Sequence, residues 1–288
     1  MSVDLLPNYI EIETSTYCNR NCRWCPNIKY ERSEKQKLIE PKLFAKIIDD
    51  LQKVEFSNKI ALHNYNEPLL DPNLFGHIEI INKNLPDAQI LILTNGDFLN
   101  KKYLEKISNY KVSLLRITLY DPIEKEDVEE AVKRHMKKSG IMKQPRDISD
   151  DFGTKCRTSY GKMDVVYYIP NFEMFTSRAG LVENHSKKRN NRCFLPFSSS
   201  AIDYEGNVKI CCEVYPEDPL HKAHGIIGNL RDGNFADFWF SDQYNEMRIR
   251  MISDDIKNPL CLSCKNKPKN ALEIDEKKLQ EWKKYLGV

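Results

Sequence analysis

The sequence predicts an α/β fold in which helices alternate with the strands of a parallel sheet. In roughly the first half of the chain, short apolar runs alternate with longer segments whose apolar residues recur at helical spacing. Strands separated by helices of about ten to fifteen residues are typical of βαβ units, and about four such units fit there. The length of 288 residues suits one domain of moderate size with a small one appended.

Local signals place the expected elements in order along the chain. Pro41 begins a helix, because the fixed φ of proline suits the first helical position. The pair Asn95-Gly96 is typical of a turn and ends the third strand. The expected strands are residues 9–14, 59–63, 88–94, 112–119 and 163–169, and the expected helices are residues 41–53, 73–84, 101–108 and 124–138.

The pattern changes in the second half of the chain. Residues 139–162 have no clear period and are expected to form a loop. Two apolar runs, residues 197–203 and 207–212, flank Glu205-Gly206 and predict a β-hairpin. A helix broken near Ser241 and a charged C-terminal helix follow. We therefore expect a first domain of residues 1–180 and a smaller second domain of residues 181–288.

Charge and hydropathy argue against several classes of protein. The chain has 44 Lys and Arg residues and 42 Asp and Glu residues, which gives a net charge of +2 with the two signs interleaved. This is not the basic surface that proteins use to bind nucleic acid or an anionic membrane. No window approaches eighteen uninterrupted apolar residues, and the N-terminus lacks the charged and apolar regions of a secretory signal. A cytoplasmic location is therefore expected, with neither nucleic acid nor a membrane as partner.

Nine cysteines in a reducing compartment indicate metal ligands rather than disulfides. Cys18, Cys22 and Cys25 form a C-x3-C-x2-C loop directly after the first expected strand. Three thiolates on one short loop can hold three irons of a [4Fe–4S] cube and leave the fourth iron without a protein ligand. The alternative is a zinc site, whose fourth ligand could be His63 only if the fold brings it close.

The cysteine loop resembles that of the radical S-adenosylmethionine (SAM) superfamily, with Trp24 as the aromatic residue before the third cysteine. The resemblance implies a partial (β/α) TIM-like barrel and an open iron that the amino and carboxylate groups of SAM chelate, so that one electron yields a 5′-deoxyadenosyl radical. Residues 64–70 resemble the family's Gly-Gly-Glu-Pro segment with both glycines replaced, which implies that Glu67 accepts the SAM ammonium. Thr94 and Asn95 lie in a segment that resembles the ribose and carboxylate contact region.

Four further cysteines resemble the auxiliary-cluster domain of SPASM-type radical SAM proteins, in its shortened "twitch" form of a hairpin and helices. They are Cys193, Cys211, Cys261 and Cys264. A hairpin and a C-terminal loop that each donate two thiolates can hold one cube, so two [4Fe–4S] clusters are expected in all. A structural zinc is the alternative for these four thiolates.

Most of the chain, from Ile10 to about Lys267, resembles twitch-domain enzymes that act on aminoglycoside cyclitols and sugars. The resemblance implies that Tyr65, Arg178 and Glu213 contact the substrate. Leu93 and Cys212 stand where such a dehydrogenase has an aromatic residue and a phenylalanine, so the substrate is expected to differ. The runs that carry the resemblance are Cys25-Pro-Asn, Glu67-Pro-Leu-Leu, Thr94-Asn-Gly-Asp-Phe-Leu and Arg178-Ala-Gly-Leu.

Several reactions remain open at this point. A dehydrogenase oxidises a secondary alcohol of a sugar, cyclitol or similar polyol and passes an electron to the second cluster, whereas an epimerase uses Cys212 to return a hydrogen atom. Radical modification of a ribosomal peptide is a third hypothesis, and a zinc-binding interaction module lies outside radical chemistry. The expected partners are a small polar substrate and a low-potential electron donor such as flavodoxin or ferredoxin.

Overall fold

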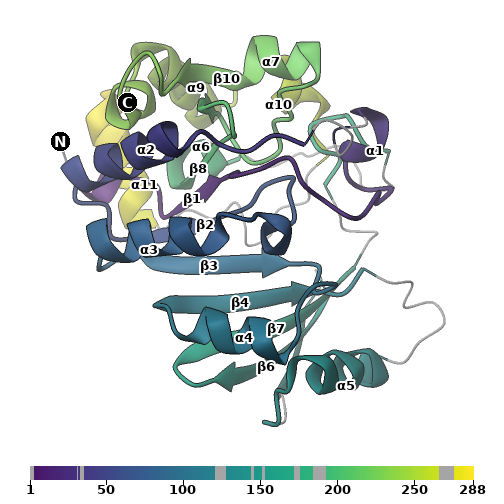
Figure 1. Cartoon of the computed structure of the whole chain (residues 1–288). Helices are drawn as coiled ribbons and strands as arrows, with labels where there is room; N and C mark the ends of the chain where they lie inside the picture. The colour runs from purple at the N-terminus through teal and green to yellow at the C-terminus, as the bar shows by residue number, and fades with distance from the viewer. Residues whose placement is uncertain are drawn as a thin grey trace.

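One mixed sheet runs through the computed structural model, which describes residues 3–30, 32, 36–120, 128–143, 146–150, 153–171, 176–183, 193–265 and 276–288. Within these residues the ten strands lie in the order β10-β9-β8-β1-β2-β3-β4-β7-β6-β5 (Figure 1). The strands are β1 (Tyr9–Ile12), β2 (Lys59–Ala61), β3 (Gln89–Thr94), β4 (Val112–Thr118), β5 (Arg146–Asp150), β6 (Gly153–Tyr160), β7 (Met163–Pro170), β8 (Ser199–Ile202), β9 (Asn207–Lys209) and β10 (Ile226–Asn229).

The centre of the sheet is parallel, and its two edges are antiparallel. Strands β8, β1, β2, β3, β4 and β7 pair in parallel, while β9 and β10 extend one edge and β6 and β5 the other. Parallel strands need long crossover connections, and helices supply them here. The predicted α/β fold is therefore confirmed.

The helices that follow the first strands cover one face of the sheet, as Figure 1 shows for α2, α3 and α4. The apolar face of α2 carries Phe44 and Ile47, both fully buried in the main core. The described helices are α1 (Asn27–Tyr30), α2 (Pro41–Lys53), α3 (Leu74–Asn84), α4 (Lys101–Ser108), α5 (Val128–Ser139), α6 (Leu195–Ser198), α7 (Pro219–Gly225), α8 (Phe235–Trp239), α9 (Asp242–Ile252), α10 (Pro259–Ser263) and α11 (Glu276–Leu286), with 3-10 turns η1 (Val3–Leu5) and η3 (Pro68–Leu70).

On the opposite face of the sheet, apolar side chains are followed by polar side chains further along the same strands. Ala61, Leu91 and Leu93 form a small apolar cluster with Tyr9 and Leu114, separate from the main core. Because successive side chains of a strand point to opposite faces, residues two positions along lie on this same face. Polar side chains at those positions line the site described below.

The prediction of a loop at residues 139–162 is wrong, because β5 and β6 lie there. Strand β6 pairs antiparallel with β7 along its whole length, and Cys156 lies opposite Tyr167. Arg157 is exposed between the buried Cys156 and Thr158. Strands with polar residues on a partly exposed face have no apolar run, so the sequence pattern is weak.

The hairpin expected around Glu205-Gly206 is confirmed, with β8 and β9 antiparallel. Strand β9 ends at Lys209, however, so Cys211 and Cys212 lie in the turn beyond it rather than on the strand as expected. The helix break near Ser241 is also confirmed, because its side chain caps α9 by accepting from the backbone N–H of Tyr244. The expected helix 124–138 is seen from Val128, and its first residues lie outside the described ranges.

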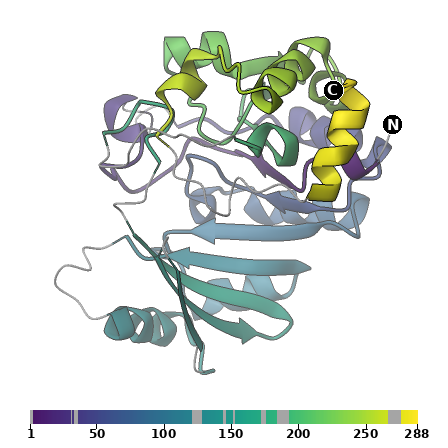
Figure 2. The same ribbon diagram turned by 180° about the vertical axis from the view of Figure 1, so that it is seen from behind.

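Aromatic packing joins the two ends of the chain. Helix α11 packs against η1 near the N-terminus (Figure 2). Trp282 donates its indole N–H to the carbonyl of Phe197 at 3.2 Å, and Trp239 donates to the carbonyl of Leu5 at 3.0 Å. The buried guanidinium of Arg248 lies 4.4 Å from the ring of Trp239 and 4.2 Å from that of Trp282. The C-terminal segment therefore packs directly on the N-terminal turn η1 and on α6.

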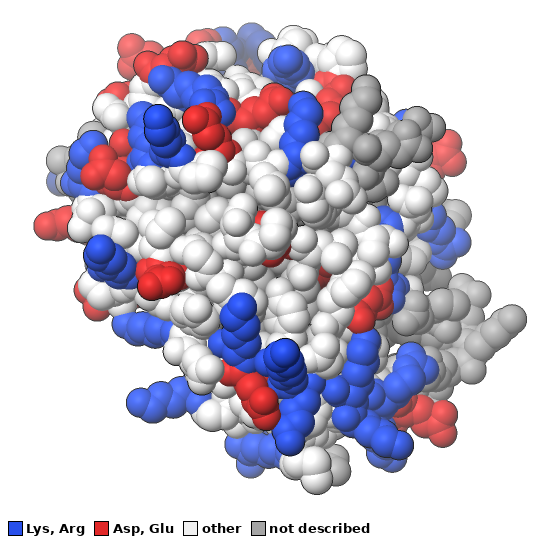
Figure 3. All heavy atoms as spheres, in the orientation of Figure 1, with Lys and Arg blue, Asp and Glu red and all other residues white. Residues whose placement is uncertain are grey.

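The surface carries charges of both signs. Figure 3 shows them interleaved over the upper part of one face, with Lys and Arg denser over α4 and α5. Within the described part of the chain, no helix has the length and hydropathy needed to cross a membrane.

Candidate active site

A polar pocket of about 340 Å³ opens at the carboxyl ends of the central strands, where α/β folds bind their ligands. This volume is within the usual range for small-molecule sites. The pocket is lined by Cys18, Arg20, Cys22, Trp24, Cys25, His63, Asn64, Tyr65, Asn66, Glu67, Leu93, Thr94, Asn95, Arg116, Thr118, Tyr120, Tyr168 and Arg178. Four predicted cofactor residues (Trp24, Glu67, Thr94 and Asn95) thus meet the first cysteine loop in one cavity.

The first three cysteines lie on the loop between β1 and α1, and none of them forms a disulfide. A turn closes the loop, with the backbone N–H of Cys25 donating to the carbonyl of Cys22 at 2.9 Å. Burial, with smaller contributions from the nearby Glu67, Cys25 and Cys22, raises the pKa of Cys18 to about 12. Thiols in such a site lose their protons when a cationic metal group binds. Three cysteines on one loop beside a polar cavity, none of them in a disulfide, fit a [4Fe–4S] cluster with one open iron.

Asp97 ties the cysteine loop to the segment after β3. Its carboxylate accepts from the guanidinium of Arg20 at 2.6 Å and from the side-chain amide of Asn19 at 2.6 Å. Asn95 donates to Asn19 at 2.9 Å. Burial acts to raise the pKa of Asp97, but the bonds from Arg20 and Asn19 outweigh it and lower that pKa overall. Asp97 thus stays ionised and holds the loop in place.

Glu67 joins the ends of β2 and β3. Its carboxylate accepts from the backbone N–H of Asn95 at 2.8 Å and from that of Leu69 at 3.1 Å, and from the hydroxyl of Thr94 at 2.5 Å. Its residue surface is 3% exposed, and burial raises the pKa of Glu67 to about 6. The carboxylate therefore positions the Thr94–Asn95 turn, and its role toward the SAM ammonium stays a prediction.

We expect Glu67→Gln to destabilise the chain by about 1–3 kcal/mol, because its amide N–H₂ meets N–H or O–H donors where a carboxylate oxygen accepted. Affinity for SAM is expected to fall as the Thr94–Asn95 turn loosens. Denaturant unfolding and equilibrium SAM binding, both under anaerobic conditions, measure the two effects. Glu205→Gln is the matched control, because the Glu205 side chain is 49% exposed in its ion pair with Lys37 and such pairs contribute little. Equal losses in the two variants would contradict this prediction.

The three residues predicted to contact the substrate converge. Arg178 lies with a guanidinium nitrogen 3.4 Å from a carboxylate oxygen of Glu213, and Thr176 donates to the other oxygen at 2.5 Å. The Arg178 guanidinium also lies 5.5 Å from the centre of the Tyr65 ring. Arg178 and Ala179 have φ of 47° and 49°, in the left-handed region that bulky residues seldom adopt. Such strain concentrates at functional sites.

Cys212 and Cys211 face different surroundings although they are neighbours in sequence. The Cys212 sulfur is 3.9 Å from a carboxylate oxygen of Glu213, and its carbonyl accepts from the Tyr65 hydroxyl at 3.1 Å. Burial raises the pKa of Cys211, and the charges of Cys212, Glu213, Cys261 and Cys193 act in the same direction. Cys212 thus lies with the substrate residues, whereas Cys211 lies with the other cysteines of the second set.

The second set of cysteines comes from three elements of the C-terminal segment. Cys193 precedes α6, Cys211 follows β9, Cys261 lies in α10, and Cys264 is the C-cap of α10. None of the four forms a disulfide, and the first three act electrostatically on the buried Tyr244. Over the described ranges, no three His, Cys, Asp or Glu side chains are placed to hold one metal ion. The ligands of a cube bind separate irons and need not converge on one point, so these four cysteines fit an iron–sulfur cluster.

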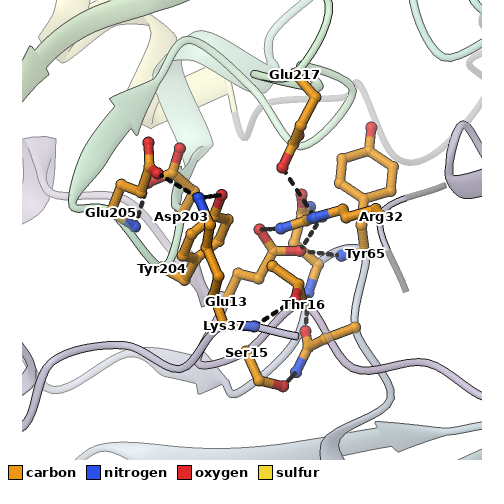
Figure 4. A network of polar contacts seen from close by, with 12 residues as sticks. Glu13, Ser15, Thr16, Arg32, Lys37, Tyr65, Asp203, Tyr204, Glu205 and Glu217 are labelled. Carbon is orange, nitrogen blue, oxygen red and sulfur yellow. Dashed lines mark hydrogen bonds and ion pairs between the residues drawn. The ribbon is translucent and has the colours of Figure 1, made fainter. Parts of the chain in front are cut away.

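A buried ion pair contacts the segment that carries Tyr65, one of the residues that line the pocket (Figure 4). Arg32 donates to both carboxylate oxygens of Glu13, at 2.8 and 2.7 Å, and lies 2.9 Å from Glu217. Glu13 also accepts from the backbone N–H of Tyr65 at 2.8 Å. Burial acts to raise the pKa of Glu13, but the Arg32 charge outweighs it and lowers that pKa overall. The pair thus links the cysteine segment, the Tyr65 loop and the C-terminal segment.

Several residues that line the pocket were not predicted from the sequence to contact a cofactor or a substrate. His63 was considered only as a zinc ligand, while Arg116, Tyr120 and Tyr168 were not singled out. A signal for Arg116 was present in β4, where Arg116 and Thr118 alternate with the apolar Leu115 and Ile117. A polar residue on alternate positions of a buried parallel strand indicates a polar inner face.

The fold and the pocket together define the class of this protein. The sequence model of the family described as "Radical SAM superfamily" matches residues 12–144. The family model described as "Iron-sulfur cluster-binding domain" (SPASM) matches residues 193–265. Residues 12–144 thus form a radical SAM domain, and residues 193–265 an iron–sulfur cluster-binding domain of the SPASM type. The expected cofactors, SAM with a [4Fe–4S] cluster and an auxiliary iron–sulfur cluster, are confirmed on this basis.

Individual relatives agree with this assignment. The S-adenosyl-L-methionine-dependent 2-deoxy-scyllo-inosamine dehydrogenase of Niallia circulans is 26% identical over 268 residues, which are 92% of this chain and 95% of that protein. The crystal structure of BtrN in complex with AdoMet and 2-DOIA has a TM-score of 0.69 and 23% identity over 91% of this chain and 94% of that one. Streptococcus suis SuiB bound to precursor peptide SuiA has a TM-score of 0.53 and 13% identity over 94% of this chain and 76% of that one. The expected resemblance to 2-deoxy-scyllo-inosamine dehydrogenase is confirmed.

Proposed function

We propose that this radical SAM enzyme is a dehydrogenase that oxidises a secondary alcohol of a cyclitol, sugar or similar polyol to a ketone. The observation that carries the proposal is the turn after β9. Cys211 belongs to the second cysteine set, and Glu213, two residues later, forms the ion pair with Arg178 beside the pocket. Groups that can bind a hydroxyl therefore lie next to the site of an electron acceptor. The likeness to a cyclitol dehydrogenase over most of both chains supports the same reaction.

When bound, SAM and the first cluster supply a 5′-deoxyadenosyl radical, and the auxiliary cluster supplies an electron acceptor. Cys18, Cys22 and Cys25 would hold the first cluster, and the second cysteine set would hold the auxiliary one. The chain's own groups bind and orient the substrate. Arg178 donates hydrogen bonds to a substrate hydroxyl and stabilises negative charge that develops on its oxygen. Glu213 accepts from a hydroxyl or ammonium group, and Tyr65 packs against the ring.

An epimerase is the second candidate, and the position of Cys212 favours it. Its sulfur lies beside Glu213, on the substrate side of the turn, where it can return a hydrogen atom to a carbon radical. Cys212→Ala separates the two reactions. A dehydrogenase keeps turning over in this variant, whereas an epimerase stalls or releases oxidised product. We place the reaction in the cytoplasm, with a low-potential flavodoxin or ferredoxin as electron donor.

The test uses the anaerobically reconstituted chain with SAM, dithionite and 2-deoxy-scyllo-inosamine, alongside related cyclitols and aminosugars. We expect 5′-deoxyadenosine and ketone in equal amounts, with deuterium from the carbinol carbon in the 5′-deoxyadenosine. Formation of 5′-deoxyadenosine with an inverted alcohol and no ketone would favour the epimerase. Absence of substrate-dependent 5′-deoxyadenosine with every alcohol would argue against both.

A further inference from the structure

His63 lies in the pocket just beyond β2, and the function proposed above gives it no role. It lines the same cavity as Tyr65 and Arg178, and its side chain is 15% exposed. The ring nitrogen Nε2 lies 3.0 Å from the Tyr9 hydroxyl and 3.8 Å from a carboxylate oxygen of Glu11. Tyr9 and Glu11 are alternate residues of β1, so both point to the pocket face of the sheet.

The contacts of Tyr9 and Glu11 assign the tautomer of the imidazole. The Nε2 atom faces two oxygens, the Tyr9 hydroxyl at 3.0 Å and a Glu11 carboxylate oxygen at 3.8 Å, and an ionised carboxylate can only accept. A proton on Nε2 therefore suits both neighbours, with the Tyr9 oxygen accepting from it. Asn64 donates to the second oxygen of Glu11, and Lys209 donates to Asn64 at 2.6 Å, which holds the carboxylate in place.

The remaining nitrogen, Nδ1, therefore carries the lone pair of the ring. Among the described residues, none forms a hydrogen bond with it. Burial lowers the pKa of His63 to about 3, and the charges of Arg116 and Arg178 act in the same direction. The free enzyme thus presents a neutral imidazole in the pocket. The titratable and charged groups that face it are Tyr9, Glu11, Glu13, Arg116, Arg178 and Lys209.

We propose that His63 accepts the hydroxyl proton of the substrate during alcohol oxidation, a role that rests on the proposed function. The carbinol carbon loses a hydrogen atom to the 5′-deoxyadenosyl radical, the hydroxyl loses its proton to Nδ1, and the remaining electron passes to the auxiliary iron–sulfur cluster. The C–O bond thereby becomes C=O, and His63 becomes an imidazolium. Tyr9 and Glu11 stabilise that imidazolium through Nε2–H, as a carboxylate does for other catalytic histidines.

A weak base is sufficient for this step, because the hydroxyl on a carbon radical is far more acidic than that of the parent alcohol. Arg178 cannot take the role, because guanidinium keeps its protons. Its ion pair with Glu213 also raises the pKa of Arg178 despite the burial that lowers it. His63 is thus the neutral nitrogen base that the described pocket offers.

The test compares ketone with 5′-deoxyadenosine in His63→Gln, using 2-deoxy-scyllo-inosamine deuterated at the carbinol carbon. Glutamine can still donate to Tyr9 but has no basic nitrogen. We expect deuterium transfer within about threefold of wild type and about a hundredfold less ketone per 5′-deoxyadenosine, the lower end of the usual contribution of a general base. Tyr9→Phe leaves the base but removes its support, so a loss of about tenfold is expected. His224→Gln, at an exposed histidine of α7, is the matched control and keeps the wild-type ratio.

The outcomes separate this proposal from the proposed function. A wild-type chain that forms no ketone overturns the dehydrogenase itself. If wild type forms ketone and His63→Gln forms as much per 5′-deoxyadenosine, His63 is not the proton acceptor. If His63→Gln keeps its iron but loses both deuterium transfer and ketone formation, His63 is a substrate-binding residue. That outcome also overturns the proposal. If His63→Gln fails to hold iron, Tyr9→Phe decides, and an unchanged ratio there overturns it.

A second measurement needs no substrate. In the full-length chain with ¹⁵N-labelled histidine, the resonances missing from His63→Gln are expected to be those of an Nε2–H imidazole with an unprotonated Nδ1. This state is expected to persist down to about pH 5, because burial and the two arginines hold the pKa of His63 at about 3. A proton on Nδ1, or titration near the ordinary value of about 6.5, would contradict the assigned base.

Discussion

Replacing Cys22 by alanine is expected to abolish SAM cleavage, with 5′-deoxyadenosine formation falling by more than about a thousandfold. Cys22 is one of three thiols on the loop between β1 and α1, and two remaining thiolates leave two irons of the cube without protein ligands. Iron and acid-labile sulfide are expected to fall from about eight to about four per chain, because the second cysteine set is untouched. Metal analysis and chromatography of the quenched reaction measure the two effects.

Cys156→Ala is the matched control for this loss. Cys156 is a buried cysteine of β6 that pairs in register with Tyr167, away from both cysteine sets. Its replacement removes one thiol from the chain but no predicted cluster ligand, so about eight irons and wild-type SAM cleavage are expected. Loss of about four irons in this variant would place a ligand outside the seven cysteines assigned here.

The second large effect is expected for Arg32→Met, which leaves the Glu13 carboxylate buried without its partner. The side chains of Arg32 and Glu13 are 2% and 0% exposed. Breaking such a pair from one side costs about 3–5 kcal/mol, because an uncompensated charge stays buried. Glu13 also holds the backbone of Tyr65, so substrate affinity is expected to fall along with stability. Denaturant unfolding of the full chain, with substrate titration, measures both.

The stability of wild type and that of Arg32→Met are expected to change with pH in opposite directions. Arg32 holds the pKa of Glu13 below its ordinary value of 4.5 against the effect of burial, so wild type keeps this contribution above about pH 4.5 and loses it on acidification. In Arg32→Met, burial acts against only the smaller effects of the Lys209 charge and the Tyr65 backbone N–H, so the pKa of Glu13 is expected to rise. The variant is therefore expected to lose stability as pH rises from about 5 to 7, through this group. Glu13→Gln in the same chain should remove that slope.

Arg231→Met is the surface control for this experiment. Arg231 pairs with Glu40 at 2.7 Å, and both side chains are 49% exposed. Exposed pairs contribute about 0–1 kcal/mol, so little change is expected. A loss in Arg32→Met no larger than this would show that Glu13 is hydrated or protonated in the folded chain.

Much of the fold could be predicted because strong local signals coincide with the central elements. Largely apolar runs mark β3 and β4, which are packed on both faces. An amphipathic pattern marks α2, which packs on the sheet with one face. Strands β5 and β6 were missed, because polar residues on a partly exposed edge carry no apolar run. The end of β9 was placed too late, since neither Ile210 nor Cys211 carries a sequence signal for the turn that follows.

The cofactor residues could be predicted because their chemistry is local in sequence. Cysteine spacing identifies a cluster loop without any knowledge of its neighbours. His63 and the Arg32–Glu13 pair could not be found in this way, because their partners lie on other strands and their roles arise from tertiary contact. Alternation on β1 does place Tyr9 and Glu11 on one face, but only the fold shows that His63 meets them there.

The continuity of the sheet sets the distance between the two metal-binding regions. The first cysteine loop leaves the end of β1, and β8 lies beside β1 in register, with the backbone N–H of Glu13 donating to the carbonyl of Ile202 at 2.8 Å. Strand β9 is the next neighbour, and Cys211 follows it by two residues. Adjacent strands lie about 4.8 Å apart, so the backbone fixes how far apart the two cysteine regions begin and, in the proposed dehydrogenase, constrains the path of the electron to the auxiliary cluster. Side chains of the pocket can therefore be exchanged for a new substrate without lengthening that path.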